Sequence, residues 1–468
     1  MFLAFLLLAA QSLVPRFEPG ACAIEIPEAE REHARCGDLV VAENRQRETG
    51  RVIRLPIIIL KSASATPAPD PVLRTLGGPG ASSLRLVRGR PASPWLQDRD
   101  LIVFEQRGTA HAQPHLACPE VDAAKAEGAP PKRVLAAART CHDRLIEEGV
   151  DLGAYDSVQS AADIEDLRQV LGYATWNLYG VSYSARLMLE VMRDHPAGIR
   201  SVVLESVLPP DANYDESGVA NAVRALEVLF ARCAADAACA QAYPRLDEVF
   251  YGLFRRANEH PIPVETTSLN GSDIANWVLD DLLSGGPDKI VAAPGLIFQV
   301  AQGDASPLRE YAQNKLAPGG AFMLGMRYSV WCREEMPFES RRSIARQGRR
   351  YPQLDGFEAS SLPAICSVWK VPPAQRRANE PVTSEIPTLI LGAEYDAYTP
   401  PAWGRQAART LTHGYFYEVP GVGHGPGFVS GCAIRVVTNF LANPTAAPYH
   451  QCLESPPPAF LTAGAPPP

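Results

Sequence analysis

One serine constrains this chain more than any other feature: it has a small residue two positions before it and two positions after it, and it lies where an apolar run meets a helical stretch. The segment is Gly180–Ser184, with Ser182 at its centre. It follows the apolar run Thr175–Tyr179 and precedes the helical stretch Ala185–Arg193. A sharp strand-to-helix turn lifts a serine hydroxyl above a sheet, and the helix N-terminus favours developing negative charge. The sequence therefore predicts a nucleophile at Ser182.

Short apolar runs alternate with helical stretches on both sides of this turn. Such alternation builds a mostly parallel sheet with helices on both faces. Together with the serine turn, it predicts an α/β fold of the α/β-hydrolase kind. We expect strands at 54–60, 72–76, 101–105, 202–204, 387–391 and 415–419, and helices at 160–171, 403–411 and 432–441.

One long block breaks the alternation and reads as helices with irregular links. It lies between the expected strands 202–204 and 387–391, so we interpret it as a mainly helical cap inserted over the active site. The Pro- and Ala-rich C-terminal tail is expected to be disordered. The expected division is a signal peptide (1–21), the first part of the core (22–210), the cap (211–380), the second part of the core (381–453) and the tail (454–468).

Two residues downstream complete a possible catalytic triad. A serine hydroxyl needs a base, and the base needs an orienting acid; in α/β-hydrolases the chain order is serine, acid, histidine. Asp396 follows an expected strand, and His424 lies in a glycine-rich loop after another. The sequence therefore favours Asp396 as the acid and His424 as the base, with Glu394 as the rival acid.

Acyl transfer also needs backbone donors for the oxyanion. The first expected donor is the N–H of Tyr183, the residue after the nucleophile. The second is expected from the loop Leu76–Gly80, whose glycines allow the backbone to approach a substrate closely. Pro79 has no N–H, so we favour Gly78, with Gly77 and Gly80 as alternatives.

The charge and the cysteine content limit the kinds of binding partner to expect and indicate the cellular compartment. The formal net charge is −8 with no dense Lys/Arg run, which argues against a nucleic-acid surface. The chain has no Cys-x-x-Cys or His-Glu-x-x-His motif, so we expect no metal and no other cofactor. An even number of cysteines, ten, fits disulfides in an oxidising compartment. Neighbours in sequence would pair as 22–36, 118–141, 233–239, 332–366 and 432–452, a connectivity that the sequence alone leaves open.

The N-terminus carries an export-like segment. The apolar run Phe2–Ala10 resembles the hydrophobic part of a secretory signal and is too short to span a bilayer. A lipid-anchored Cys22 is the alternative, in a poor sequence context. We therefore expect a secreted or periplasmic protein without a membrane span.

Several ordered motifs resemble the proline iminopeptidase and tripeptidyl aminopeptidase family of α/β-hydrolases. They are Cys36–Val41, Leu76–Gly80, Glu105–Thr109, Ala162–Arg168, Gly180–Tyr183, Asp396 with Thr399–Pro400, and His424. The likeness spans about Cys36–Pro209 and Glu385–Cys452, and the cap matches only at Val330–Glu334. Three departures are Leu76 for a frequent His, Ser184 for Gly, and Glu105 for Asp in a segment that we interpret as mainly structural.

The resemblance implies cleavage of a peptide bond near a free N-terminus, with peptides as substrates. An anionic pocket under the cap would bind the substrate ammonium. Glu334 is the first candidate and Glu335 the second; alternatively, these carboxylates pair with Arg333 or face solvent. An esterase or amidase acting on small molecules through the same triad is the competing function, and a non-catalytic binding protein is a third.

Overall fold

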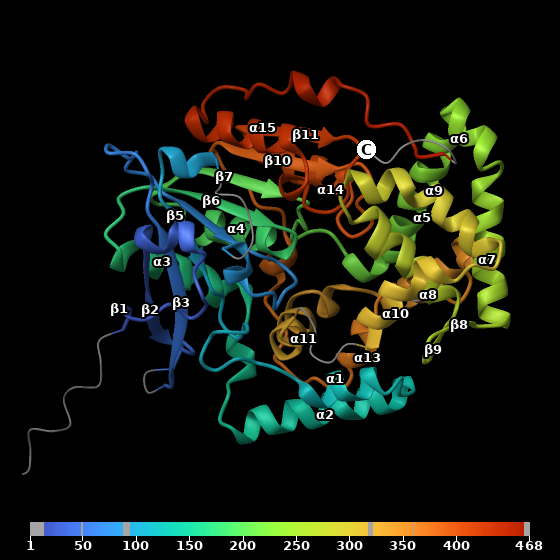
Figure 1. The fold of residues 1–468 in the computed structure, drawn as a ribbon. Helices are drawn as coiled ribbons and strands as arrows, with labels where there is room; N and C mark the ends of the chain where they lie inside the picture. Colours follow the sequence, from blue (N-terminus) through green and yellow to red (C-terminus); the bar gives the residue numbers. More distant parts are fainter. Residues whose placement is uncertain (1–13, 48–49, 88–93, 317–321, 358, 463–468) are drawn as a thin grey trace, which may run out of the picture.

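A twisted nine-stranded sheet forms the centre of the computed structural model (Figure 1). The structure describes residues 14–47, 50–87, 94–316, 322–357 and 359–462. Neighbouring strands follow the order β1-β2-β3-β5-β4-β6-β7-β10-β11. The strands are β1 (Arg16–Pro19), β2 (Ala34–Ala42), β3 (Val52–Leu60), β4 (Val72–Thr75), β5 (Leu101–Phe104), β6 (Trp176–Val181), β7 (Ile199–Glu205), β10 (Thr388–Ala393) and β11 (Gly414–Val419).

The six strands from β5 to β11 run parallel, and β1 to β3 form an antiparallel edge. Every residue of β4, β5, β6 and β10 is buried, as expected for parallel strands covered on both faces. The α/β-hydrolase fold class predicted from the sequence is confirmed. Because parallel strands end at one edge, the loops that follow β6, β7, β10 and β11 gather there.

Helices cover both faces of the sheet and bury a separate apolar core on each. On one face lie α3 (Ser157–Val170), α4 (Tyr183–Asp194) and α14 (Pro401–Ala408), which share one apolar core; α4 packs against β6 and β7, and α14 against β10 and β11. On the other face lies α15 (Gly431–Ala442), which packs against β10 and β11. Figure 1 shows α15 next to β10 and β11.

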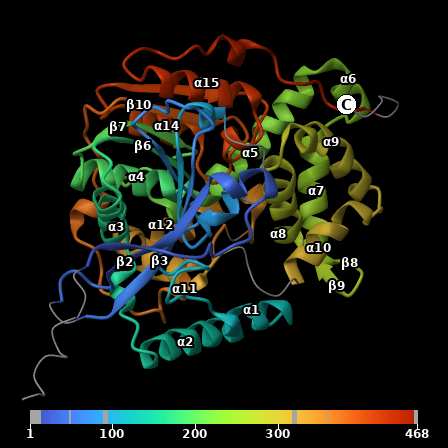
Figure 2. The same ribbon diagram turned by 60° about the vertical axis from the view of Figure 1, so that its left-hand side comes forward.

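A mainly helical insertion between β7 and β10 forms a second mass beside the sheet (Figure 2). It has an apolar core of its own, built largely from α5, α7, the π-helix and α9. The insertion comprises α5 (Tyr214–Ala235), α6 (Ala237–Ala242), α7 (Leu246–Glu259), β8 (Ile262–Val264), β9 (Thr267–Leu269), α8 (Gly271–Asn276), a π-helix (Trp277–Leu283), α9 (Pro287–Ala301), α10 (Arg309–Leu316), α11 (Leu324–Glu334), α12 (Arg341–Arg350) and α13 (Leu362–Ile365).

Two helices from the first part of the chain join this insertion instead of covering the sheet. They are α1 (Pro119–Ala126) and α2 (Pro131–Glu147), and their apolar sides share one core with α11 and α13. Figure 1 shows all four together, below the sheet. The sequence division placed this segment in the hydrolase core because nothing in its pattern indicates a partner far along the chain.

Both ends of the chain differ from the simplest sequence interpretation. Strand β1 lies within the range 1–21 assigned to a signal peptide and pairs with β2, while Phe2–Ala10 lies outside the described residues. Disorder of the tail was the wrong prediction for 456–461. The Leu461 N–H donates to the Val291 carbonyl at 2.9 Å, and its carbonyl accepts from Tyr243 Oη at 3.1 Å. The side chain of Phe460 packs on the cap core, so the tail ties the end of the chain to the cap.

The cysteine pairing expected from the sequence is confirmed. Disulfides join Cys22–Cys36, Cys118–Cys141, Cys233–Cys239, Cys332–Cys366 and Cys432–Cys452, and none of the ten cysteines is free. No helix in the described ranges is both long and apolar enough to cross a membrane.

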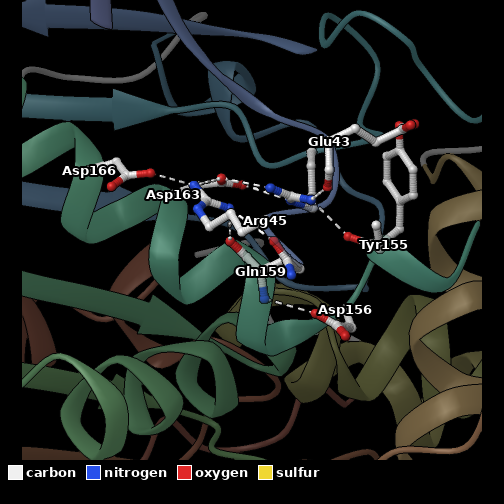
Figure 3. A network of polar contacts seen from close by, with 9 residues as sticks. Glu43, Arg45, Tyr155, Asp156, Gln159, Asp163 and Asp166 are labelled. Atoms are coloured by element: carbon white, nitrogen blue, oxygen red, sulfur yellow. Dashed lines mark hydrogen bonds and ion pairs between the residues drawn. The ribbon is translucent and has the colours of Figure 1, made fainter. Parts of the chain in front are cut away.

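A buried ionic network fixes the Glu105–Thr109 segment, which the sequence analysis interpreted as structural. Arg107 is fully buried; its Nε and Nη2 atoms each lie 2.7 Å from an oxygen of Asp163. Its Nη1 donates to the backbone carbonyls of Glu43 and Ala154. Arg45 reaches Asp163 from the other side, at 2.6 Å (Figure 3). Burial alone would raise the pKa of Asp163, but the two guanidinium groups outweigh it and lower that pKa.

Candidate active site

Ser182 occupies a strained turn between β6 and α4. Its φ is 62° and its ψ is −129°, a backbone conformation that side-chain-bearing residues rarely adopt. The turn leaves little room: a Cβ on Gly180 would lie 2.4 Å from the Ser184 carbonyl oxygen. The Ser182 N–H donates to the Glu205 carbonyl at 2.9 Å. Ser182 is partly exposed between fully buried neighbours, as the predicted elbow requires.

Asp396 is fully buried in the turn after β10 and is saturated with donors. Its Oδ1 accepts from the backbone N–H groups of Tyr398 and Thr399, both at 2.9 Å. Its Oδ2 accepts from Thr399 Oγ1 at 2.9 Å and lies 2.8 Å from His424 Nδ1. Burial by itself would raise the pKa of Asp396, but His424 and these donors lower it below its ordinary value. The group is therefore held as a carboxylate against the imidazole.

His424 lies in the loop after β11, with its side chain 22% exposed. Burial would lower the pKa of His424, but the Asp396 carboxylate outweighs burial and raises it. Within the described residues Nε2 has no hydrogen-bond partner, whereas Nδ1 faces Asp396. The loop lies against the elbow, because a Cβ built on Gly425 would be 3.5 Å from Val181 Cγ2. The structure thus joins Asp396 to His424 and places the histidine loop beside the strand that carries Ser182.

The rival acid Glu394 is engaged elsewhere. Its two carboxylate oxygens lie 2.8 and 3.0 Å from Arg232 of α5. It also accepts the Gly421 N–H at 2.8 Å. Glu394 therefore joins the core to the cap helix, and no contact connects it to His424.

The glycine loop after β4 approaches the elbow directly. A Cβ on Gly77 would lie 2.9 Å from both Ser182 Cβ and the Tyr183 nitrogen, so only glycine fits there. Gly78 has a φ of 116°, and its carbonyl accepts from Arg327 of α11 at 2.5 Å. Among the described residues, the N–H groups of Gly78 and Tyr183 have no acceptor. Both predicted donors are consequently free to bind an oxyanion.

Glu334 and Glu335 lie at the end of α11, and both are buried. Glu334 accepts from the Ser157 N–H and hydroxyl at 2.6 Å each, and the Ser157 hydroxyl also lies 2.9 Å from Tyr183 Oη. Arg186 of α4 pairs with both carboxylates. Burial raises the pKa of Glu335 to about 7. Two carboxylates thus share one guanidinium group beside a polar cavity of about 240 Å³.

The alternative partner considered for these carboxylates, Arg333, pairs with Asp156 at 2.8 Å instead. Helix geometry explains why Arg333 does not pair with Glu334: adjacent residues on α11 point to different faces of the helix.

Sequence reasoning missed a polar link from the cap to the histidine. Tyr398 packs edge-on against the His424 ring, with ring centroids 5.5 Å apart. Its hydroxyl donates to Asp280 of the π-helix, whose side chain is exposed. A Cβ on Gly423 would collide with the Leu283 carbonyl, so the π-helix presses on the histidine loop. π-Helices are frequent at functional sites, but no residue pattern in this cap signals one.

Comparison with known proteins agrees with this architecture. The family model described as "TAP-like protein" matches residues 353–467. The serine protease Hip1 of Mycobacterium tuberculosis H37Rv is 22% identical over 462 residues, covering 89% of this chain and 86% of Hip1. The putative hydrolase YuaR of Escherichia coli K12 is 24% identical over 357 residues, covering 69% of this chain and 68% of YuaR.

Among solved structures, the proline iminopeptidase of Mycobacterium smegmatis has a TM-score of 0.39 at 13% identity, covering 87% of this chain and 98% of that one. A thermophilic esterase from Thermogutta terrifontis has a TM-score of 0.40 at 14% identity, covering 87% and 99%.

The fold and the relatives define a serine hydrolase of the α/β-hydrolase class. Within that class, residues 353–467 match the TAP-like family model, and 89% of the chain is similar to the serine protease Hip1.

Proposed function

We propose that this protein is an exported serine aminopeptidase that cleaves peptide bonds near a free N-terminus, releasing a prolyl or tripeptidyl unit. Ser182 Oγ attacks the scissile carbonyl carbon while His424 Nε2 takes the hydroxyl proton. The C–N bond then breaks, and His424 gives the proton to the leaving amine. A water molecule, deprotonated by His424, hydrolyses the acyl-enzyme ester and restores Ser182.

One observation carries the proposal: the 2.8 Å contact between Asp396 Oδ2 and His424 Nδ1, in a loop that lies against the elbow. A carboxylate on Nδ1 fixes the tautomer whose Nε2 accepts a proton, and it stabilises the imidazolium that forms. The unengaged N–H groups of Tyr183 and Gly78 support their roles as oxyanion donors. No described residue forms a hydrogen bond with His424 Nε2, which supports the role of this atom as the proton acceptor.

The role of Ser182 is tested by Ser182→Ala. We expect it to abolish labelling by a fluorophosphonate probe and to lower kcat by about 10⁶-fold, as loss of a triad serine does elsewhere. Ser184→Ala is the matched control, because Ser184 lies two residues after Ser182 and its hydroxyl contacts Thr75 of the neighbouring strand β4. Labelling of the Ser182→Ala protein at native rates would refute the proposal.

For the substrate ammonium, the cap offers two carboxylate sites. Glu334, with Glu335 behind it, shares Arg186, so this group carries one net negative charge when both are ionised. Asp280 is exposed and is linked through Tyr398 to the His424 ring. A carboxylate beside the base suits a free N-terminus close to the scissile bond.

One panel of substrates distinguishes the proposed aminopeptidase from the alternative esterase. The panel comprises prolyl and tripeptidyl chromogenic amides, their N-acetylated forms, and simple aryl esters. We expect blocked amides to be poor substrates, and Glu334→Gln or Asp280→Asn to raise KM for the free amides alone. Good turnover of esters with no cleavage of any amide would instead establish the esterase.

Export is supported by the five disulfides and by the apolar run near the N-terminus. Fractionation of cells that express the full chain, with N-terminal sequencing of the product, tests it. Recovery of uncleaved chain in the reducing cytosol would contradict export.

A further inference from the structure

Two consecutive residues at the end of β7, Glu205 and Ser206, contact the segments of all three proposed catalytic residues. We infer that Glu205 and Ser206 are positioning residues that hold the histidine loop and the acid in register with the nucleophile turn. The inference rests on the proposed function, because it takes Ser182, Asp396 and His424 as the reacting groups.

Two hydrogen bonds and two close approaches establish these contacts. The Glu205 carbonyl accepts the Ser182 N–H at 2.9 Å, which fixes the backbone of the nucleophile turn. Ser206 Oγ accepts the Gly425 N–H at 2.9 Å, next to His424. The same hydroxyl faces the Asp396 carboxylate and helps to lower its pKa. A Cβ on Gly427 would lie 2.0 Å from Glu205 Oε1, so the Glu205 carboxylate lies against the histidine loop. The histidine loop is therefore contacted at Gly425 and at Gly427, one and three residues after His424.

The hydroxyl of Ser206 can perform both tasks at once. A serine hydroxyl has one donor and two acceptor sites, so it can accept from Gly425 while it donates to Asp396. Ser206 is fully buried, and its φ is 46°, in the left-handed region that favours glycine. Glycine would remove the backbone strain but would supply neither hydrogen bond. A strained, buried serine in contact with a catalytic carboxylate is the kind of outlier from which a functional role can be inferred.

Glu205 adds a buried charge near the base. Its side chain is fully buried and accepts from Tyr179 Oη. The Arg74 guanidinium, 4.3 Å from the centre of the Tyr179 ring, supplies a positive charge nearby. Burial raises the pKa of Glu205, and Arg74 and Tyr179 oppose that rise. In its ionised form Glu205 favours the imidazolium form of His424. The other titratable or charged groups that face this histidine are Asp396, Tyr398, Asp280 behind Tyr398, and Arg74 behind Glu205.

The test compares Ser206→Ala and Ser206→Gly in the full chain, with p-nitrophenyl butyrate as substrate so that peptide specificity has no influence. We expect both variants to lose about tenfold in kcat, which corresponds to 1.4 kcal/mol, with KM little changed. Ser206→Gly removes the strain, so we expect it to unfold at a temperature no lower than Ser206→Ala. Ser201→Ala is the matched control. It removes a buried hydroxyl that donates to Asn177 at 2.7 Å, near the start of β7 and away from the end that bears Glu205 and Ser206.

The pH profile of Glu205→Gln gives a second readout that a merely structural role would not move. Glutamine keeps an acceptor for Gly427 but removes the charge that favours imidazolium. Because catalysis needs the neutral imidazole, the acid limb of kcat/KM should move to lower pH.

Native kcat in Ser206→Gly, an equal loss in Ser201→Ala, or an unmoved acid limb in Glu205→Gln would each overturn the inference. Native activity in Ser182→Ala would instead refute the proposed function, so the two failures are distinguishable.

Discussion

Replacing Arg107 by methionine should destabilise the fold by about 4 kcal/mol, the cost expected when one partner of a buried ion pair is removed. Arg107 makes four contacts of 2.6–2.7 Å from a fully buried site. The variant leaves two carbonyls without this donor. Asp163 keeps Arg45 at 2.6 Å, so we place the cost in the middle of the 3–5 kcal/mol range.

The assay is urea denaturation followed by circular dichroism, with linear extrapolation of the free energy of unfolding. Arg245→Met is the matched control, because its pair with Glu248 is 76% and 62% exposed and should contribute less than about 1 kcal/mol. The double variant Arg107→Met/Asp163→Leu should be more stable than Arg107→Met alone, since it no longer buries an undercompensated carboxylate.

The difference between native protein and Arg107→Met should depend on pH. The folded-state pKa of Asp163 is lowered, so its ionisation stabilises the native fold above the unfolded pKa of about 3.9 and ceases to do so as pH falls through the folded pKa. The difference in free energy of unfolding between the native protein and Arg107→Met should therefore become smaller at acidic pH. A loss of under about 1 kcal/mol in Arg107→Met at pH 7 would refute the reasoning from buried ion pairs.

Four further predictions concern the site, a disulfide and the tail. Asp396→Asn should lower kcat by about 10⁴-fold with little change in KM, because the amide favours the wrong tautomer of His424; a loss under about tenfold would contradict this role. In the native enzyme kcat/KM should fall as pH drops through the His424 pKa, which Asp396 raises above its ordinary 6.5, and a flat profile between pH 5 and about 8 would count against it. Replacing Cys332 and Cys366 by serine opens a loop of sequence separation 34 and should cost about 4 kcal/mol, measured by urea denaturation; an unchanged midpoint would exclude the loop-entropy argument. Deleting 455–468 should lower the thermal midpoint, and an unchanged midpoint would show that the tail contacts on the cap are negligible.

The sequence predicted those parts of the molecule that depend on local pattern. The parallel strands and their helices follow from apolar periodicity, and the loops with Ser182, Asp396 and His424 follow from glycine and strand endings. The disulfides follow because each pair is close in sequence. The strands β1 and β2 were both missed. Strand β1 (Arg16–Pro19) lies at the edge of the sheet, has no apolar run and is defined by the strand that it pairs with.

Features that depend on distant parts of the chain could not be predicted. Glu205 and Ser206 read as the end of an apolar strand. The Gly425 N–H that Ser206 accepts belongs to a loop 219 residues further along the chain. The tail has the composition of a disordered segment, but Phe460 finds a partner surface on the cap core that exists only after the cap has folded. Glu334 was singled out as a candidate for binding the substrate ammonium, which stays a prediction, and its pairing with Arg186 was not foreseen.

The order of the cysteine bridges has a consequence for biogenesis. Every cysteine is joined to the very next one along the polypeptide, so no bridge encloses or crosses another. Under the proposed export into an oxidising compartment, each bond could close before the following pair arrives, and correct oxidation would need no reshuffling of partners. None of these five bridges connects the insertion to the sheet, so apart from the two places where the polypeptide itself passes between them, non-covalent contacts alone hold the insertion in place.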